Sequence, residues 1–103
     1  MLNITEELLR RVSILNIEVA EDLKRRLPIY NTVKELNNFF HMLLAQYTKD
    51  TFLYRSTLNA ELTEEAWLQS FCKNIVPLMA SIGLPSYTVV KPVPMYECES
   101  SNG

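Results

Sequence analysis

The chain has 103 residues, of which 48% are hydrophobic and 21% charged, and its formal net charge is −2. This length suits one domain with a modest core, and the composition is that of a folded chain rather than a disordered one. A net charge this small creates no strong field toward nucleic acid or an anionic membrane, so both kinds of partner are disfavoured.

Cysteine and glycine counts exclude further classes of protein. The two cysteines, Cys72 and Cys98, are too few for a disulfide scaffold and too far apart for a CxxC metal motif. The two glycines, Gly83 and Gly103, cannot build a phosphate-binding loop, which needs several glycines close together. We find neither a signal peptide nor a membrane-spanning run, and we expect a cytoplasmic protein without a cofactor or a metal.

The first predicted element is one long helix from Thr5 to about Leu27. Thr5 is a residue type that caps helices, and Pro28 interrupts the pattern. Apolar residues recur at steps of three and four, as expected for a helix with one buried face. This apolar stripe consists of Leu8, Val12, Leu15, Val19 and Leu23.

Two basic clusters lie on this predicted helix, Arg10-Arg11 and Lys24-Arg25-Arg26. They suggest a surface for nucleic acid, but each of the four arginines follows an acid by four residues, in the order that favours an ion pair. The predicted pairs are Glu6–Arg10, Glu7–Arg11, Glu21–Arg25 and Asp22–Arg26. We therefore favour a salt-bridged surface in contact with solvent, and nucleic-acid binding is the alternative.

Ile14 and Ile17 lie opposite the apolar stripe, on a face that also carries Arg10, Glu21, Lys24 and Arg25. A pair of isoleucines within a charged face suggests contact with something. Two interpretations have equal weight. Either another element of the same domain covers the pair, or the pair is the apolar centre of an interface with a charged rim. The second interpretation predicts a protein partner or a homo-oligomer at this helix.

A second helix is predicted from Thr32 to about Lys49, and Thr32 and Glu35 have the spacing of a capping box. Its predicted apolar face consists of Val33, Leu36, Phe40, Leu43, Leu44 and Tyr47. The single histidine, His41, falls on the polar face, so we do not expect it to form a catalytic pair with Cys72. The following residues, 51–58, are rich in strand formers and fit a short strand or an ordered loop.

The third predicted helix begins at Thr63 and stops at Gly83, since a glycine, an apolar residue and a proline in sequence end helices. Pro77 falls inside this helix and predicts a kink on its solvent side. The predicted apolar face consists of Trp67, Phe71, Ile75, Leu78 and Ile82.

The C-terminal residues 87–91 fit a strand, which Pro92 and Pro94 restrict to an edge strand or a polyproline-like arm. Such an arm either adds to a partner's sheet or packs on the chain's own helices. Its candidate interaction residues are Val89, Val90 and Val93. Residues 97–103 are predicted to be a disordered tail, which leaves 1–96 as the domain.

These elements together predict a mostly α, three-helix single domain with a short strand pair at about 52–58 and 87–91 and an extended C-terminal arm. No residue cluster requires an enzyme. We expect a small intracellular protein–protein interaction module, an adaptor, inhibitor or regulator, that self-associates through the first helix. A nucleic-acid-binding regulator that uses the basic ends of that helix is the second hypothesis, and an enzyme is the third.

Overall fold

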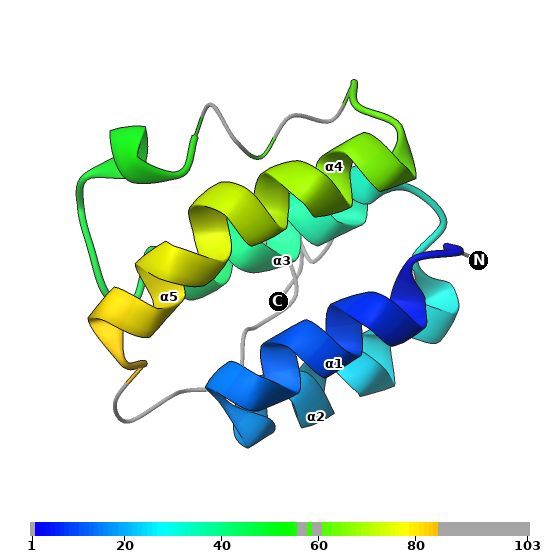
Figure 1. Ribbon diagram of the computed structural model, residues 1–103, viewed down its shortest axis with the longest axis horizontal. Helices are drawn as coiled ribbons and strands as arrows, with labels where there is room; N and C mark the ends of the chain where they lie inside the picture. The colour runs from blue at the N-terminus through cyan, green and yellow to red at the C-terminus, as the bar shows by residue number, and fades with distance from the viewer. Residues whose placement is uncertain (1, 56–57, 59–60, 85–103) are drawn as a thin grey trace, which may run out of the picture.

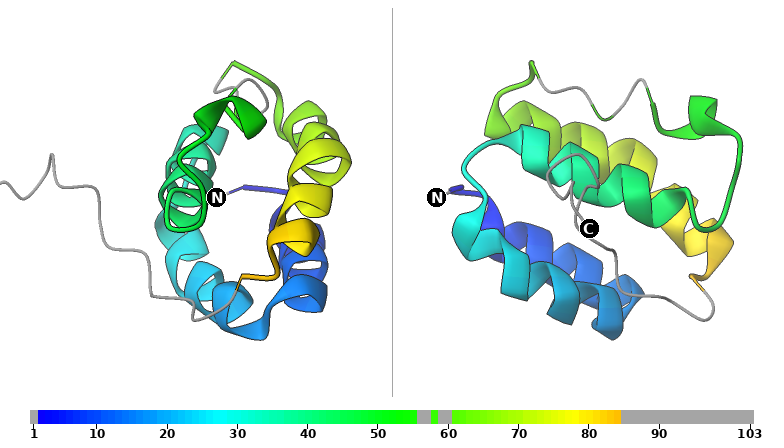
Figure 2. Two further views of the ribbon diagram at one scale, coloured as in Figure 1. Left: turned by 90° about the vertical axis from the view of Figure 1, so that its left-hand side faces the viewer. Right: turned by 180° about the vertical axis from the view of Figure 1, so that it is seen from behind.

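A computed structural model of the chain describes residues 2–55, 58 and 61–84, and this part of the chain is mostly helical (Figure 1). Its α-helices are α1 (Thr5–Leu15), α2 (Ile17–Arg26), α3 (Val33–Leu44), α4 (Glu64–Ser70) and α5 (Val76–Ile82). A π turn at Phe71–Ile75 joins α4 to α5, and 3-10 turns lie at Leu27–Ile29 and Thr51–Leu53. Seen end-on, the helices surround one common interior (Figure 2).

The first predicted helix is in fact two helices, and the prediction of one rod from Thr5 to Leu27 is wrong. Asn16 has an extended backbone (φ −163°, ψ 115°), and its side-chain oxygen accepts a hydrogen bond from the Val19 N–H at 3.0 Å. Asparagine favours this N-cap position because its side chain replaces a missing helical partner. The chain reverses at Asn16, so α1 and α2 form an antiparallel hairpin (Figure 1).

The start of α1 also differs from the prediction. Thr5 is the first helical residue rather than the cap, and its hydroxyl donates to the carbonyl of Leu2 at 2.9 Å. The N-cap position belongs to Ile4, which is buried in the core and makes no side-chain cap bond. Burial of Ile4 thus takes the place of a polar cap at this end.

The apolar stripe of the first segment lies in the core as predicted, despite the break. Leu8, Val12, Val19 and Leu23 are fully buried, and Leu15 packs against the same core from its edge. Each helix of the hairpin turns its half of the stripe to the interior. The apolar stripe therefore predicts the buried faces of α1 and α2 correctly, but it does not predict that the chain reverses between them.

Helix α3 begins with the predicted capping box. The Thr32 hydroxyl oxygen accepts from the Lys34 N–H, and the Glu35 carboxylate accepts from the Thr32 N–H at 2.9 Å. The helix ends at Leu44, earlier than predicted, because a tighter turn follows in which the Tyr47 N–H donates to the Leu44 carbonyl. The predicted buried face is confirmed, with Tyr47 half-buried, and Phe39 is buried in addition.

Replacing Thr32 by alanine is expected to lower the free energy of unfolding by about 1 kcal/mol at neutral pH, because α3 loses its cap. Burial raises the pKa of Glu35, but the hydrogen bonds from the Thr32 hydroxyl and backbone N–H outweigh it, so this pKa lies below its ordinary value of 4.5. A carboxyl with a lowered folded-state pKa stabilises the fold fully above pH 4.5 and loses that contribution as the pH falls through the folded pKa.

The difference between wild type and Thr32→Ala should therefore shrink in acid. Urea unfolding at neutral pH and at about pH 3 measures it, since the lower pH lies under the ordinary carboxyl range. Thr32→Ser keeps the hydroxyl and is the matched control that should behave like wild type. A difference between wild type and Thr32→Ala that does not change with pH would contradict the role given to Glu35.

The ends of the third predicted helix are confirmed. The Thr63 hydroxyl oxygen accepts from the Ala66 N–H at 3.2 Å and caps α4. At the other end, Gly83 has a left-handed backbone (φ 78°), and its N–H donates to the Met79 carbonyl. Next to it, the Leu84 carbonyl accepts a long hydrogen bond of 3.5 Å from the Asn16 side chain, which ties the end of α5 to the tip of the hairpin.

Pro77 neither ends the helix nor leaves it regular. A proline has no N–H, and its ring collides with the carbonyl four residues earlier in a regular helix, here that of Lys73. The preceding turn is widened, and the Val76 N–H bonds to the carbonyl of Phe71, five residues back. Pro77 is exposed, on the solvent side where it was predicted.

The π turn also changes which residues of α5 face the core. A wide turn adds about one residue to the repeat and so shifts the register of the residues that follow. Met79 is almost completely buried, whereas Leu78 and Ile82 are only half-buried. The prediction that placed Leu78 and Ile82 on the buried face is corrected in this respect, because it assumed a regular helix.

Aromatic rings join α3 to the helix that runs from α4 to α5. The Phe40 ring lies 4.7 Å from Phe71 and 6.1 Å from Trp67, and Trp67 stacks on Phe71 at 5.1 Å, measured between ring centres. The Trp67 indole N–H donates to the side-chain oxygen of Asn37. This aromatic cluster and the buried residues of the hairpin belong to one core.

The predicted strand pair finds no support in the described residues. Thr51–Leu53 is a 3-10 turn, which the Asp50 carboxylate stabilises by accepting from the Phe52 N–H at 3.2 Å. An aspartate that binds the backbone two residues ahead favours a turn over a strand, and this local preference overrides the strand-forming residue types. The other half of the pair, 87–91, lies outside the described residues, as do the C-terminal arm and the predicted tail 97–103.

Candidate functional site

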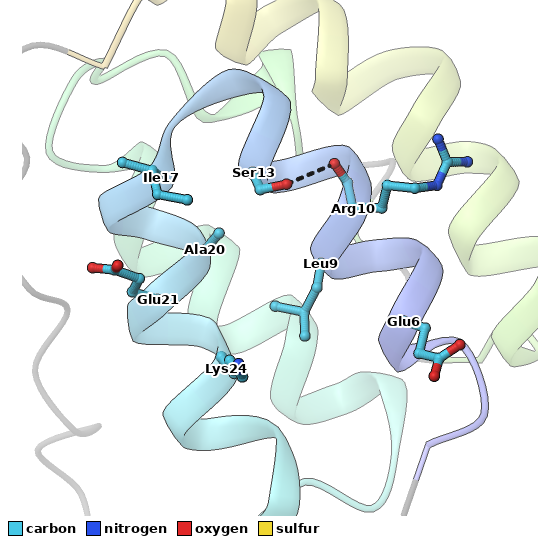
Figure 3. A pocket seen from close by; sticks show the side chains of 8 residues that line it. All are labelled: Glu6, Leu9, Arg10, Ser13, Ile17, Ala20, Glu21 and Lys24. Atoms are coloured by element: carbon cyan, nitrogen blue, oxygen red, sulfur yellow. Dashed lines mark hydrogen bonds between the residues drawn. The ribbon is translucent and has the colours of Figure 1, made fainter.

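An open groove of about 430 Å³ lies between α1 and α2 on the outer face of the hairpin (Figure 3). Leu9, Ile17 and Ala20 supply its apolar lining. Its polar margin consists of Glu6, Arg10 and Ser13 from α1 and of Glu21 and Lys24 from α2. We call this feature the hairpin groove.

Short side chains explain why the groove is hollow. Ala20 ends at Cβ, and the Ser13 hydroxyl turns to its own helix, where it donates to the Arg10 carbonyl at 3.0 Å (Figure 3). Neither side chain fills the space beside Leu9 and Ile17. The antiparallel path that Asn16 imposes then places these residues of α1 opposite those of α2.

Ile14 and Ile17 lie on either side of Asn16, at the tip of the hairpin. Their exposed fractions are 74% and 60%, so the described part of the chain does not cover them. Ile17 lines the hairpin groove, and Ile14 does not. The break at Asn16 thus separates two residues that a continuous helix would have placed on one face.

Of the other predicted interaction residues, some line the hairpin groove and others do not. Arg10 and Glu21 line the hairpin groove, whereas Arg25 is exposed outside it and binds Asp22. Val89, Val90 and Val93 lie outside the described residues. Lys24, which the sequence places on the same face, also lines the groove, and sequence reasoning missed four lining residues, namely Glu6, Leu9, Ser13 and Ala20. The signal that points to them is Asn16, a preferred N-cap residue that the apolar repeat concealed.

A single acid on α1 binds two arginines. The Glu7 carboxylate accepts from Arg10 at 2.5 Å and from Arg11 at 2.7 Å, and these two hydrogen bonds lower the pKa of Glu7. The predicted pair of Glu7 with Arg11 is confirmed, but Arg10 pairs with Glu7 instead of Glu6. An acid three residues before a base is close enough on a helix surface to replace the one four residues before it.

On α2, a second acid binds two arginines, and this acid, Asp22, is buried. One of its carboxylate oxygens accepts from Arg25 at 3.1 Å and from Arg26 at 3.0 Å, so the predicted pair with Arg26 is confirmed. Arg25 therefore does not form the predicted pair with Glu21. The Arg26 guanidinium also lies over the Phe39 ring, 5.5 Å from its centre, which anchors α2 on α3.

Glu7 and Asp22 each pair with two arginines. Three other charged residues at the groove make no ion pair with any described residue: Glu6, Glu21 and Lys24. All three side chains are exposed. Their charges are therefore available to a molecule that covers the groove.

The remaining chemical groups do not form a reactive arrangement in the described residues. His41 is exposed, and its ring lies edge-on to buried Tyr54 at 5.3 Å between ring centres. Cys72 is a half-buried free thiol in the π turn. Across residues 2–55, 58 and 61–84, no three side chains of histidine, cysteine, aspartate or glutamate are grouped to hold a metal ion.

Comparison with models of protein families, with curated proteins and with solved structures gives no match to this chain. In the described part of the chain, no helix has the length and apolar character needed to span a bilayer.

Proposed function

We propose that this protein is a protein–protein interaction module that binds its partner through the hairpin groove. The observation that carries the proposal is an apolar lining, with Ile17 60% exposed, inside a margin that carries both signs of charge. Protein interfaces have this construction, with an apolar centre and a polar rim. A single exposed isoleucine is ordinary, but Ile17 borders a hollow that further apolar side chains line.

The expected affinity is modest. Full burial of an exposed isoleucine contributes about 1.5–3 kcal/mol, and association itself costs several kcal/mol. Ile17 alone therefore gives weak binding. The charged margin must add to it, and charges at a rim contribute mainly specificity and the rate of association.

The structure offers no observation that favours nucleic acid as the partner. Arg10 and Arg11 share the carboxylate of Glu7, and Arg25 and Arg26 share that of Asp22. A phosphate would have to compete with these carboxylates for the same guanidinium groups. We therefore do not propose the nucleic-acid function.

Site-specific photo-crosslinking tests the proposed function. A photoreactive amino acid at Ile17, introduced in cells of the source organism, is expected to give a discrete protein adduct because this side chain borders the groove. The same amino acid at Ala80, an exposed residue of α5, is the matched control. The mass of the adduct identifies the partner. No adduct at Ile17, or identical adducts at both positions, would show that the groove is not a protein-binding site.

A further inference from the structure

We infer that the partner in the hairpin groove is a second copy of this chain, related to the first by a two-fold axis that lies in the plane of the groove. This inference rests on the proposed function and names the partner. It comes from the order of the charges around the margin.

The charges at the margin alternate in sign around the groove. On α1, Glu6 lies toward the open end of the hairpin and Arg10 lies closer to its tip, while on α2 Glu21 lies closer to the tip and Lys24 toward the open end (Figure 3). Since the helices are antiparallel, an acid lies across from a base at both ends. Each helix also carries one acid and one base.

This alternation makes the face complementary to itself. An axis along the groove brings Glu6 of one copy to Lys24 of the second copy, and Arg10 to Glu21. An axis across the groove instead brings Glu6 to Arg10, and Glu21 to Lys24. In both arrangements every charge meets the opposite sign, as a two-fold interface between identical patches requires.

The charges are also free to pair between copies. Glu6, Glu21 and Lys24 make no ion pair with a described residue, so pairing them across an interface breaks none of the ion pairs described above. Arg10 shares the Glu7 carboxylate with Arg11, and two positive groups with one negative group leave this corner positive. An unrelated partner must supply the matching alternation, whereas a second copy already carries it.

The apolar lining fits the same arrangement. A second copy seated face to face brings its own Leu9 and Ile17 to the hollow that the short side chains of Ser13 and Ala20 leave unfilled. Apolar surface from both copies is then removed from water at the centre, and the charged margin fixes the register.

A charge-complementation experiment tests the inference. Glu6→Lys with Glu21→Lys makes the margin wholly positive, and Arg10→Glu with Lys24→Glu makes it wholly negative. For each double variant alone, the dissociation constant of the dimer is expected to be more than about tenfold higher than that of wild type, because like charges then meet. Mixing the two variants in equal amounts should restore a dimer of one copy of each, measured by sedimentation and native mass spectrometry.

Glu65→Lys, the same change at an exposed residue of α4, is the matched control and should leave the dimer intact. Wild type that stays monomeric up to about 100 μM would overturn the inference. An adduct at Ile17 with a different protein would then still support the proposed function. Two charge variants that dimerise separately as well as wild type would also overturn it. Should either unfold, as circular dichroism would reveal, Ile17→Lys replaces it and must weaken the dimer.

Discussion

Replacing Trp67 by alanine is expected to lower the free energy of unfolding by about 3–5 kcal/mol, the range for removing a large aromatic side chain from a core. The Trp67 side chain is 1% exposed and packs on the rings of Phe40 and Phe71. Its removal leaves a cavity where α3 meets α4, and the surrounding helices can fill this only in part. It also leaves the Asn37 side-chain oxygen without its indole donor.

Trp67→Phe separates the effect of the cavity from that of the lost hydrogen bond, because it keeps much of the ring packing and removes the indole N–H. We expect it to cost about 1 kcal/mol for the hydrogen bond to half-buried Asn37, plus the effect of a smaller cavity. The urea midpoints of both variants and the wild type measure these differences. A midpoint for Trp67→Ala equal to that of wild type would mean that this face of α4 does not lie in the core.

The sequence predicts best those features that depend on neighbours along the chain. Thr32 with Glu35, Thr63 and Gly83 were all located correctly because a cap is a contact within about four residues. The buried faces of α1, α2 and α3 were also predicted, since apolar periodicity reflects which side of a helix avoids water.

The hairpin groove could not be predicted, because its two walls come together only when the chain reverses at Asn16. The apolar repeat continues through that residue, from Leu15 to Val19, with the spacing of an unbroken helix. Asn16, a preferred N-cap residue, is the local sign of the reversal, but the apolar repeat by itself fits one continuous rod equally well. Leu9 and Ala20 consequently line one groove, although a single rod would hold them apart along its axis.

The last turns of the third predicted helix show a second reason why sequence-based prediction fails. Pro77 was recognised as an irregularity, but its effect depends on how the backbone relieves the clash. The chain relieves the clash by widening the preceding turn, and Met79 is then the residue of α5 that is buried in the core. Tertiary contacts decide between such local solutions, so a helical wheel assigns the residues before Pro77 better than those after it.

The second large effect concerns Asp22, and Asp22→Ala is expected to lower the free energy of unfolding by about 2–4 kcal/mol. The Asp22 carboxylate is buried and accepts from Arg25 and Arg26. Removing the buried carboxylate takes away the anion that two guanidinium groups share, and the loss is larger for Arg26, which is mostly shielded from solvent. The Arg26 guanidinium cannot simply turn to solvent without leaving the Phe39 ring, so α2 loses its anchor on α3.

The two arginines provide the control, since they bind the same oxygen of Asp22 at nearly equal distances but differ in exposure. The Arg25 side chain is 65% exposed and that of Arg26 is 21% exposed. Arg25→Ala should therefore change the free energy of unfolding by less than about 1 kcal/mol, as an exposed pair does. Arg26→Ala should cost about 2 kcal/mol or more, because it also removes packing and the contact with Phe39. Equal effects of the two substitutions, measured by urea unfolding at neutral pH, would show that burial of Arg26 does not strengthen this pair.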